Sequence, residues 1–184
     1  MQPENIVALF PEFEEIKNEE LRAKAIQATI LAMEAGGWTL ETADKAPVSV
    51  SWDRCSCSLI EHVRKVTRVC IRVYEEVAPF YKANGVPFDR DTVVAGALLH
   101  DIGKWTEFAL VDGKPVHSHT ADLMRHPLSG AILADRAGLP MNIVHLIATH
   151  SFEGEKSYQT AESDFVRTLD IFVFNCSVKG LKKK

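Results

Sequence analysis

Six histidine and aspartate side chains stand at positions where a folded chain usually places apolar residues or ends a helix. His62 shares an apolar stripe with Val66 and Val69, and Asp170 lies inside the apolar run TLDIFVF. The other four begin or end predicted helices: His100, Asp101, His126 and His150. A buried carboxylate is costly unless a cation or hydrogen-bond donors compensate its charge. Because helical bundles often direct His and Asp side chains into their core to bind metals, the combination predicts a metal site.

Each of these residues, taken alone, has a simpler interpretation. A single histidine on an apolar stripe is more often a hydrogen-bonded core residue than a metal ligand. Asp101 could be an ordinary residue at a helix end, and Asp170 could pair with Arg167. The metal hypothesis therefore depends on the combination. Imidazole and carboxylate suit a divalent ion such as Mn²⁺, Fe²⁺, Co²⁺, Ni²⁺ or Zn²⁺, and we favour Mn²⁺ or Fe²⁺ because such a site selects poorly and availability decides.

Helical patterns cover the segments that must position these side chains. A capping box at Ser58 starts a helix that should kink or end at Pro79, and Asp91 is the expected N-cap of a short apolar helix. Because that short helix has no polar face, it should lie at the centre of the fold. The predicted helices span residues 19–35, 58–79, 92–100, 127–138, 140–150 and 162–176.

Strand signals are almost absent from the chain. The segment 48–52 alternates apolar and polar residues, but it follows Pro47 and is predicted to be a loop or a short extended arm. The expected fold class is therefore all-α, a helical bundle.

Composition limits the classes of protein that fit. The 184 residues, 46% of them hydrophobic and 25% charged, suit one soluble globular domain. A net charge of −4, from 21 Lys and Arg against 25 Asp and Glu, argues against a general affinity for nucleic acid. No apolar run is long enough for a membrane span, and the acidic N-terminus is unlike a signal peptide. Four cysteines make no disulfide framework, so we expect a cytoplasmic protein with reduced thiols.

The six candidate residues follow the order H…HD…H…H…D along the chain. Together with the motif LLHDIGK at residues 98–104, this order resembles the HD-domain superfamily of metal-dependent phosphohydrolases. The segments RHPLSGA at 125–131, GLP at 138–140 and ATH at 148–150 are similar to the same branch of that superfamily. The resemblance covers residues 58–175, so the expected architecture is an HD-domain helical bundle with an additional N-terminal helical segment.

The resemblance implies a centre of one or two divalent metal ions. It assigns one ion to His62, His100, Asp101 and Asp170, with Asp101 bridging to a second ion held by His126 and His150. It also implies hydrolysis by a metal-activated water, with Asp101 and Lys104 as the catalytic residues.

Residues 105–125 are expected to form a loop beside the substrate. Lys104 is the nearest cation for a phosphoryl group, and Arg125, His117 and His119 are the next candidates for substrate binding. The same loop contains aromatic and apolar residues that could enclose an uncharged ring. We expect a phosphoester substrate and keep two alternatives: ring-opening C–C hydrolysis of a cyclic diketone, and a noncatalytic ligand-binding or regulatory module.

The predicted organisation has three parts. Residues 1–57 form an N-terminal helix and arm for packing or dimerisation, residues 58–176 form the HD domain, and residues 177–184 form a basic tail. The expected partner is a small-molecule substrate, with a homodimer as an option and with no nucleic-acid or membrane partner.

Overall fold

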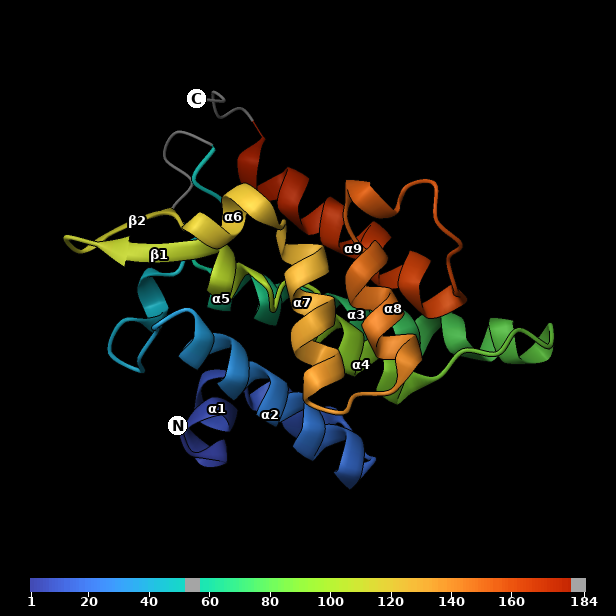
Figure 1. Ribbon diagram of the computed structural model, residues 1–184. Helices are drawn as coiled ribbons and strands as arrows, with labels where there is room; N and C mark the ends of the chain where they lie inside the picture. Colours follow the sequence, from blue (N-terminus) through green and yellow to red (C-terminus); the bar gives the residue numbers. More distant parts are fainter. Residues whose placement is uncertain (52–56, 180–184) are drawn as a thin grey trace.

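Helices make up most of the fold, as the sequence predicts (Figure 1). The structure, a computed structural model, describes residues 1–51 and 57–179. The all-α class is confirmed, with one two-stranded hairpin within the described ranges. In chain order the elements are α1 (Pro3–Leu9), η1 (Pro11–Glu15), α2 (Glu19–Ala35), η2 (Ala43–Lys45), α3 (Leu59–Ala83), α4 (Arg90–Leu99), α5 (Lys104–Glu107), β1 (Phe108–Val111), β2 (Lys114–His117), α6 (His119–Leu123), α7 (His126–Arg136), α8 (Met141–Thr149), η3 (Phe152–Gly154) and α9 (Ala161–Val178).

Helix α4 lies at the centre of the bundle. Every residue from Thr92 to Leu99 is buried, and α4 packs against α2, α3, α8 and α9. The absence of a polar face predicted this position, because a helix that is apolar all round must be covered on all sides. Side chains that α3, α8 and α9 direct toward the C-terminal end of α4 therefore meet the residues that follow it.

Helix α3 starts as predicted but extends further than predicted. Ser58 Oγ accepts a hydrogen bond from the Glu61 N–H at 3.2 Å, and Glu61 Oε2 accepts one from the Ser58 N–H at 2.9 Å, which completes the expected capping box. The helix passes through Pro79 and ends at Ala83, so of the two outcomes predicted at Pro79, a kink or an end, the end is wrong. Proline cannot donate to the carbonyl four residues back, but that residue, Glu75, is exposed, and water can hydrogen bond to its carbonyl.

The N-cap of α4 is Asp89 and not the predicted Asp91. Asp89 Oδ1 accepts a hydrogen bond from the Thr92 N–H at 2.7 Å. Asp91 accepts instead from the N–H groups of Lys17 and Asn18, at 3.0 and 2.7 Å, and so ties the start of α2 to α4. The prediction failed because both carboxylates are competent caps, and the extended backbone at Asp89 selects between them.

Residues 105–125 form regular elements instead of the predicted loop. After α5, the strands β1 and β2 pair antiparallel, with Phe108 opposite His117 at the open end of the hairpin. The turn residues Asp112 and Gly113 have φ values of 50° and 74°, as a two-residue hairpin turn requires. The Asp-Gly pair is a sequence signal for this turn, whereas the short strands on either side carry too little alternation to be recognised alone.

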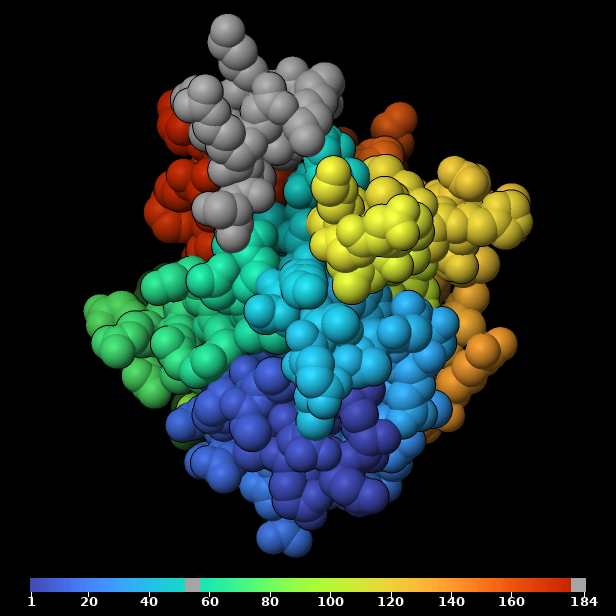
Figure 2. All heavy atoms as spheres, turned by 90° about the vertical axis from the view of Figure 1, so that its left-hand side faces the viewer, coloured from blue at the N-terminus to red at the C-terminus, as the bar shows by residue number. Residues whose placement is uncertain are grey.

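The N-terminal segment packs onto the same core as the helices that follow it. Phe13 and Leu99 belong to one buried hydrophobic cluster, and Trp38 Nε1 donates a hydrogen bond to the Trp105 carbonyl oxygen at 2.8 Å. Figure 2 shows the first helices (blue) next to the chain that leads into the arm (cyan), with the hairpin (yellow) beside it. Residues 1–51 are thus tied to the bundle, and their role in dimerisation stays a prediction.

Residues 48–51 of the predicted arm belong to the first described range. Pro47 forms an isolated antiparallel bridge with Ser58, and residues 48–51 follow without regular structure. Trp52, the last residue of the predicted arm, and residues 180–184 of the predicted basic tail lie outside the described residues. Within the described ranges, the helices are all too short or too polar to cross a membrane.

Candidate metal centre

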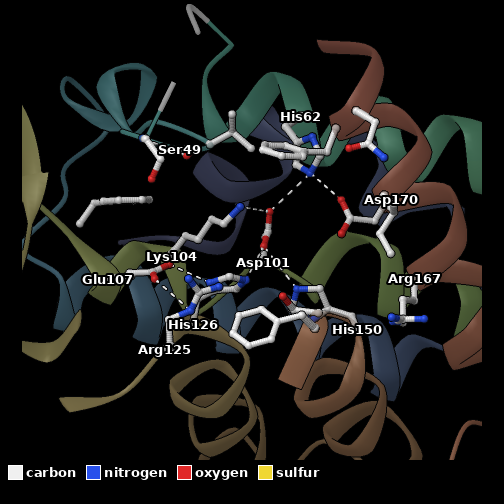
Figure 3. Close-up of a pocket in the computed structure, with 18 of the residues that line it drawn as sticks. Ser49, His62, Asp101, Lys104, Glu107, Arg125, His126, His150, Arg167 and Asp170 are labelled. Carbon is white, nitrogen blue, oxygen red and sulfur yellow. Dashed lines mark hydrogen bonds and ion pairs between the residues drawn. The ribbon is translucent and has the colours of Figure 1, made fainter. Parts of the chain in front are cut away.

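Five helices direct the six predicted side chains to one place (Figure 3). His62 comes from α3, His126 is the first residue of α7, and Asp170 comes from α9. The other three follow the last turns of α4 and α8: His100, Asp101 and His150. Five of the six are buried, and the side chain of Asp170 is 15% exposed. The structure therefore brings all six candidate ligands together.

The six side chains form two groups of three. In the first group, His62 Nε2 lies 2.9 Å and His100 Nε2 lies 3.5 Å from Asp170 Oδ1. In the second group, His126 Nε2 lies 3.3 Å and His150 Nε2 lies 3.5 Å from Asp101 Oδ1. Each residue of a group offers one ligand atom, and these atoms lie within 4.8 Å of one another. Each group therefore has the spacing to hold one metal ion.

Asp101 connects the two groups. Its Oδ1 faces the second group, while its Oδ2 lies 3.5 Å from His62 Nε2 and 3.4 Å from His100 Nε2 in the first. Lys104 Nζ donates a hydrogen bond to the same Oδ2 at 2.8 Å. A carboxylate with one oxygen toward each group is arranged to bridge two ions.

Backbone carbonyls orient two of the imidazole rings. His100 Nδ1–H donates to the Ala97 carbonyl oxygen at 2.7 Å, and His150 Nδ1–H donates to the Ile147 carbonyl oxygen at 2.7 Å. Because a carbonyl holds Nδ1–H in this arrangement, Nε2 faces the cluster and is the ring atom available to a metal ion. This is the ring orientation that a metal-binding histidine needs.

Glu107 orients the ring of His126. Its Oε2 lies 2.8 Å from His126 Nδ1, and its side chain is buried at the end of α5. Sequence patterns did not predict this residue, since the segment KWTEF shows no apolar stripe from which a buried glutamate would stand out. Its role depends on the fold that brings α5 against the start of α7.

A close approach between the turn after Asp101 and α7 places His126. A Cβ at Gly103 would overlap the His126 carbonyl oxygen and would lie 2.6 Å from Ser129 Oγ and 2.7 Å from the Gly130 nitrogen. Glycine alone leaves this space free. The glycine of the HDIG motif is therefore required for α7 to start beside Asp101.

The charges of the cluster shift pKa values in different directions. Burial lowers the pKa of His62. Burial also disfavours the charged form of His100, but the Asp101 and Asp170 carboxylates outweigh it and raise the pKa of His100 to about 10. Despite burial, Lys104 and His100 hold the pKa of Asp101 well below its usual range. The pKa of Asp170 is likewise lowered against burial, chiefly by His100. Both carboxylates are therefore ionised at neutral pH.

The surroundings of one buried oxygen, Asp101 Oδ1, show whether the residues present fit a metal ion. Asp101 Oδ1 is shielded from solvent, and no donor among the described residues forms a hydrogen bond with it. The groups that face it are the Nε2 atoms of His126 and His150. An ionised oxygen in this position needs a nearby positive charge, and imidazole with carboxylate is a donor set for divalent transition metals. The residues present therefore fit a divalent metal site.

A cavity of about 420 Å³ opens beside the cluster. Three of the residues predicted for substrate binding line it, namely Lys104, His117 and Arg125. The fourth, His119, is not among the lining residues, and its side chain is 86% exposed and lies 3.6 Å from Asp122. The structure does not bring His119 to the site, because β2 ends at His117 and the chain turns away into α6.

Several lining residues were not predicted from the sequence. Val48, Ser49 and Ser51 come from the arm, which the sequence connected only with packing or dimerisation. Arg167 also lines the cavity, although the sequence suggested it only as a partner for Asp170. Its position three residues before Asp170 on α9 was the available signal, since residues three apart lie on the same helix face.

The sequence profile of the HD domain family matches residues 59–173. The chain belongs to the HD-domain family. All six clustered residues of the HD domain lie inside the matched range, and the resemblance predicted from the motifs is confirmed. No solved structure matches the chain.

A curated relative extends this comparison. The chain is 34% identical over 145 residues to the dihydroneopterin 2',3'-cyclic phosphate phosphodiesterase of Methanocaldococcus jannaschii. The similarity covers 74% of this chain and 55% of the relative, so the chain spans about half the length of that protein.

Metal binding to the metal-free HD domain is expected to release about one proton per chain near neutral pH. With a pKa of about 10, His100 is protonated before the metal binds, and coordination through Nε2 requires the loss of that proton. Titration of Mn²⁺ into the metal-free protein, by calorimetry in buffers of different ionisation enthalpy, measures the proton release. Binding enthalpies that are the same in every buffer would contradict this protonation state.

Substitution of Glu107 by Gln is expected to weaken metal binding at the second group by about 10- to 100-fold, because His126 loses the carboxylate that lies 2.8 Å from its Nδ1 and raises its basicity. Calorimetric titration with Mn²⁺ measures this affinity. Glu153→Gln is the matched control, since it removes the same charge from a partly exposed carboxylate that contacts Arg125. Equal metal affinities in the wild type and Glu107→Gln would refute the orienting role.

Proposed function

We propose that this HD-domain chain is a divalent-metal-dependent hydrolase whose substrate is a small phosphoester. The observation that carries the proposal is the arrangement of two three-residue groups that the buried Asp101 connects, with Lys104 beside them, in one cavity. Paired metal sites of this kind serve phosphatases and nucleases, where they act on the attacking and leaving oxygens of one phosphoryl group.

The curated relative supports the phosphoester class. Its name is that of a phosphodiesterase that acts on a 2',3'-cyclic phosphate. Because the chain spans about half of that relative, we take from the name only a class, so a cyclic phosphodiester is the first substrate to test. A cavity of about 420 Å³ is within the range of small-molecule sites.

The residues of the chain have distinct roles in this proposal. A bound divalent cation supplies Lewis acidity, which lowers the pKa of water and offsets phosphoryl charge. Asp101 sets the spacing of the two groups, and Lys104 Nζ, 2.8 Å from Asp101 Oδ2, holds a positive charge beside the reacting group. Burial of the cluster excludes bulk water, which strengthens these electrostatic interactions. Arg125 and His117 line the cavity and are proposed to orient the substrate.

We propose Mn²⁺ or Fe²⁺ as the working ion, because a His and Asp site discriminates weakly and Zn²⁺, Co²⁺ or Ni²⁺ can compete for it. Asp101, His126 and His150 are proposed as ligands of one ion, and His62, His100 and Asp170 as ligands of the other, with Asp101 between them. The proposed setting is the cytoplasm, with a small-molecule substrate as partner and no nucleic acid, and with residues 1–57 for packing or homodimerisation.

A cyclic diketone is the alternative substrate class. Phe108, Phe152 and Phe174 line the cavity and can pack against an uncharged ring. The same metal groups can polarise a carbonyl oxygen, which would support ring-opening C–C hydrolysis. A noncatalytic binding module is the remaining alternative, and one experiment separates all three.

The protein purified without chelators is expected to contain about two transition-metal ions per chain and to hydrolyse cyclic phosphodiesters in preference to cyclic diketones. Metal content by mass spectrometry and turnover on a panel of nucleoside 2',3'-cyclic phosphates, aryl phosphodiesters and cyclic diketones measure this. Asp101→Asn is expected to stay folded and to lose about 10³-fold or more in turnover, because the oxygen that bridges the groups is replaced by a neutral amide.

Other results of the same experiment would favour an alternative function or refute the proposal. Turnover of diketones alone would assign the chain to C–C hydrolysis. No bound metal after addition of Mn²⁺ or Fe²⁺, or substantial turnover in a folded Asp101→Asn protein, would refute the metal-dependent hydrolase.

Replacing Lys104 by Ala is expected to lower kcat on phosphodiesters by about 10²-fold with the metal content retained, because a positive charge beside the phosphoryl group is lost. Steady-state kinetics with metal analysis of the same sample measures both quantities. Lys114→Ala, in the exposed strand β2, is the matched control. Wild-type turnover in Lys104→Ala would favour an uncharged substrate.

A further inference from the structure

Three cationic side chains are among the described residues that line the cavity, and they differ in what they already bind. Lys104 Nζ donates to Asp101 at 2.8 Å. Arg125 Nε donates to Glu153 Oε1 at 3.1 Å, and its guanidinium lies over the Phe152 ring at 5.3 Å. The third cation is Arg167, and it has no comparable partner.

Arg167 is largely buried, yet its donors are poorly satisfied. Its side chain is 19% exposed, and its Nε is shielded from solvent without a hydrogen-bond partner among the described residues. The nearest carboxylate oxygen, Glu155 Oε1, lies 3.6 Å from Nη2, which is beyond hydrogen-bond distance. A buried N–H without an acceptor is costly, so this guanidinium is arranged for an acceptor that the chain itself does not supply.

The position of Arg167 relative to the metal ligands indicates what that acceptor is. Arg167 lies one helical turn before Asp170 on α9, so both residues face the same side of that helix. Figure 3 shows Arg167 on the side of the His and Asp cluster opposite Lys104, outside the network of dashed contacts. A group that lies over the cluster therefore has Lys104 on one side and Arg167 on the other.

We infer that Arg167 is a substrate-binding residue that donates from Nε and Nη to non-bridging oxygens of the substrate's phosphoryl group. This inference rests on the proposed phosphohydrolase function. A guanidinium offers two parallel N–H donors that match two phosphoryl oxygens, and Nε with one Nη forms such a pair. Glu155, 63% exposed and 3.6 Å from Nη2, is the nearby anion that would compete weakly with a phosphoryl group for the guanidinium.

The test is the binding of inorganic phosphate to the full chain loaded with Mn²⁺, followed by calorimetry. Arg167→Gln is expected to raise the Kd for phosphate by about 10- to 100-fold, because charge-assisted hydrogen bonds are lost, while the Mn²⁺ content stays that of the wild type. The Kd of Arg167→Lys for phosphate is expected to lie between the values of the wild type and Arg167→Gln, since lysine keeps the charge and loses the paired donors. In kinetics on a phosphodiester, Arg167→Gln is expected to raise KM and lower kcat.

Two further variants separate this role from a general effect of charge. Glu155→Gln is expected to lower the Kd for phosphate by about 1.5- to 5-fold, because an exposed competitor is removed. Arg136→Gln removes the same charge as Arg167→Gln from an exposed position at the end of α7, and it is expected to bind phosphate like the wild type.

Three results would overturn the inference. The first is a wild-type Kd for phosphate in metal-loaded Arg167→Gln, and the second is a loss of Mn²⁺ in that variant that accounts for the weaker binding. The third is a metal-loaded wild-type protein that does not bind phosphate. Weaker phosphate binding in Arg167→Gln of a protein that turns over no phosphoester would support the inference and refute the proposed function. A wild-type Kd for phosphate in Arg167→Gln, together with phosphoester turnover by the wild-type protein, would refute the inference and support the proposed function.

Discussion

The carboxylate of Asp101 is 1% exposed and follows the buried central helix α4, where an ionised group costs several kcal/mol unless cations and donors surround it. Lys104 and four imidazoles surround it here, and those imidazoles come from α3, α4, α7 and α8. The same positions of the helices around α4 are therefore needed both for core packing and for the charges around Asp101. A helix shifted by one turn would lose its core contacts and its ligand together.

Helix ends explain how the imidazoles are oriented. His100 and His150 each follow the last turn of a helix, and each donates Nδ1–H to a backbone carbonyl three residues back. Carbonyls of a last turn lack helical partners and lie at the negative end of the helix dipole, so they accept this proton readily. His126 stands at the opposite end of its helix, where the free backbone groups are N–H donors. Glu107 supplies the oxygen that the backbone cannot offer there.

Sequence reasoning identified the residues whose polarity conflicts with their local surroundings. His62 on an apolar stripe and Asp101 after an apolar helix are conflicts visible within one helix. Glu107 lies in a segment of mixed polarity, and its surroundings arise from parts of the chain that are distant in sequence, so no local pattern predicts it. For Arg167 the one local signal was its place three residues before Asp170, on the same face of α9. The N-cap Asp89 was missed for a different reason, because Asp89 and Asp91, two residues apart, carried the same local signal, and it is the carboxylate of Asp91 that has a tertiary partner, the N–H of Asn18.

Different parts of the chain form the two sides of the cavity. The metal side comes from helices inside the family match at 59–173. The remaining wall includes residues outside that match, namely Val48, Ser49 and Ser51 of the arm and Phe174 and Asn175. The arm lies in irregular structure, and its cavity-lining Ser49 and Ser51 are not part of the buried core. The family match therefore covers the six clustered residues, while the arm and the end of α9 add residues to the cavity wall that the match does not include. Two HD-domain proteins with the same six clustered residues can for this reason differ in the part of the cavity wall that the family match does not include.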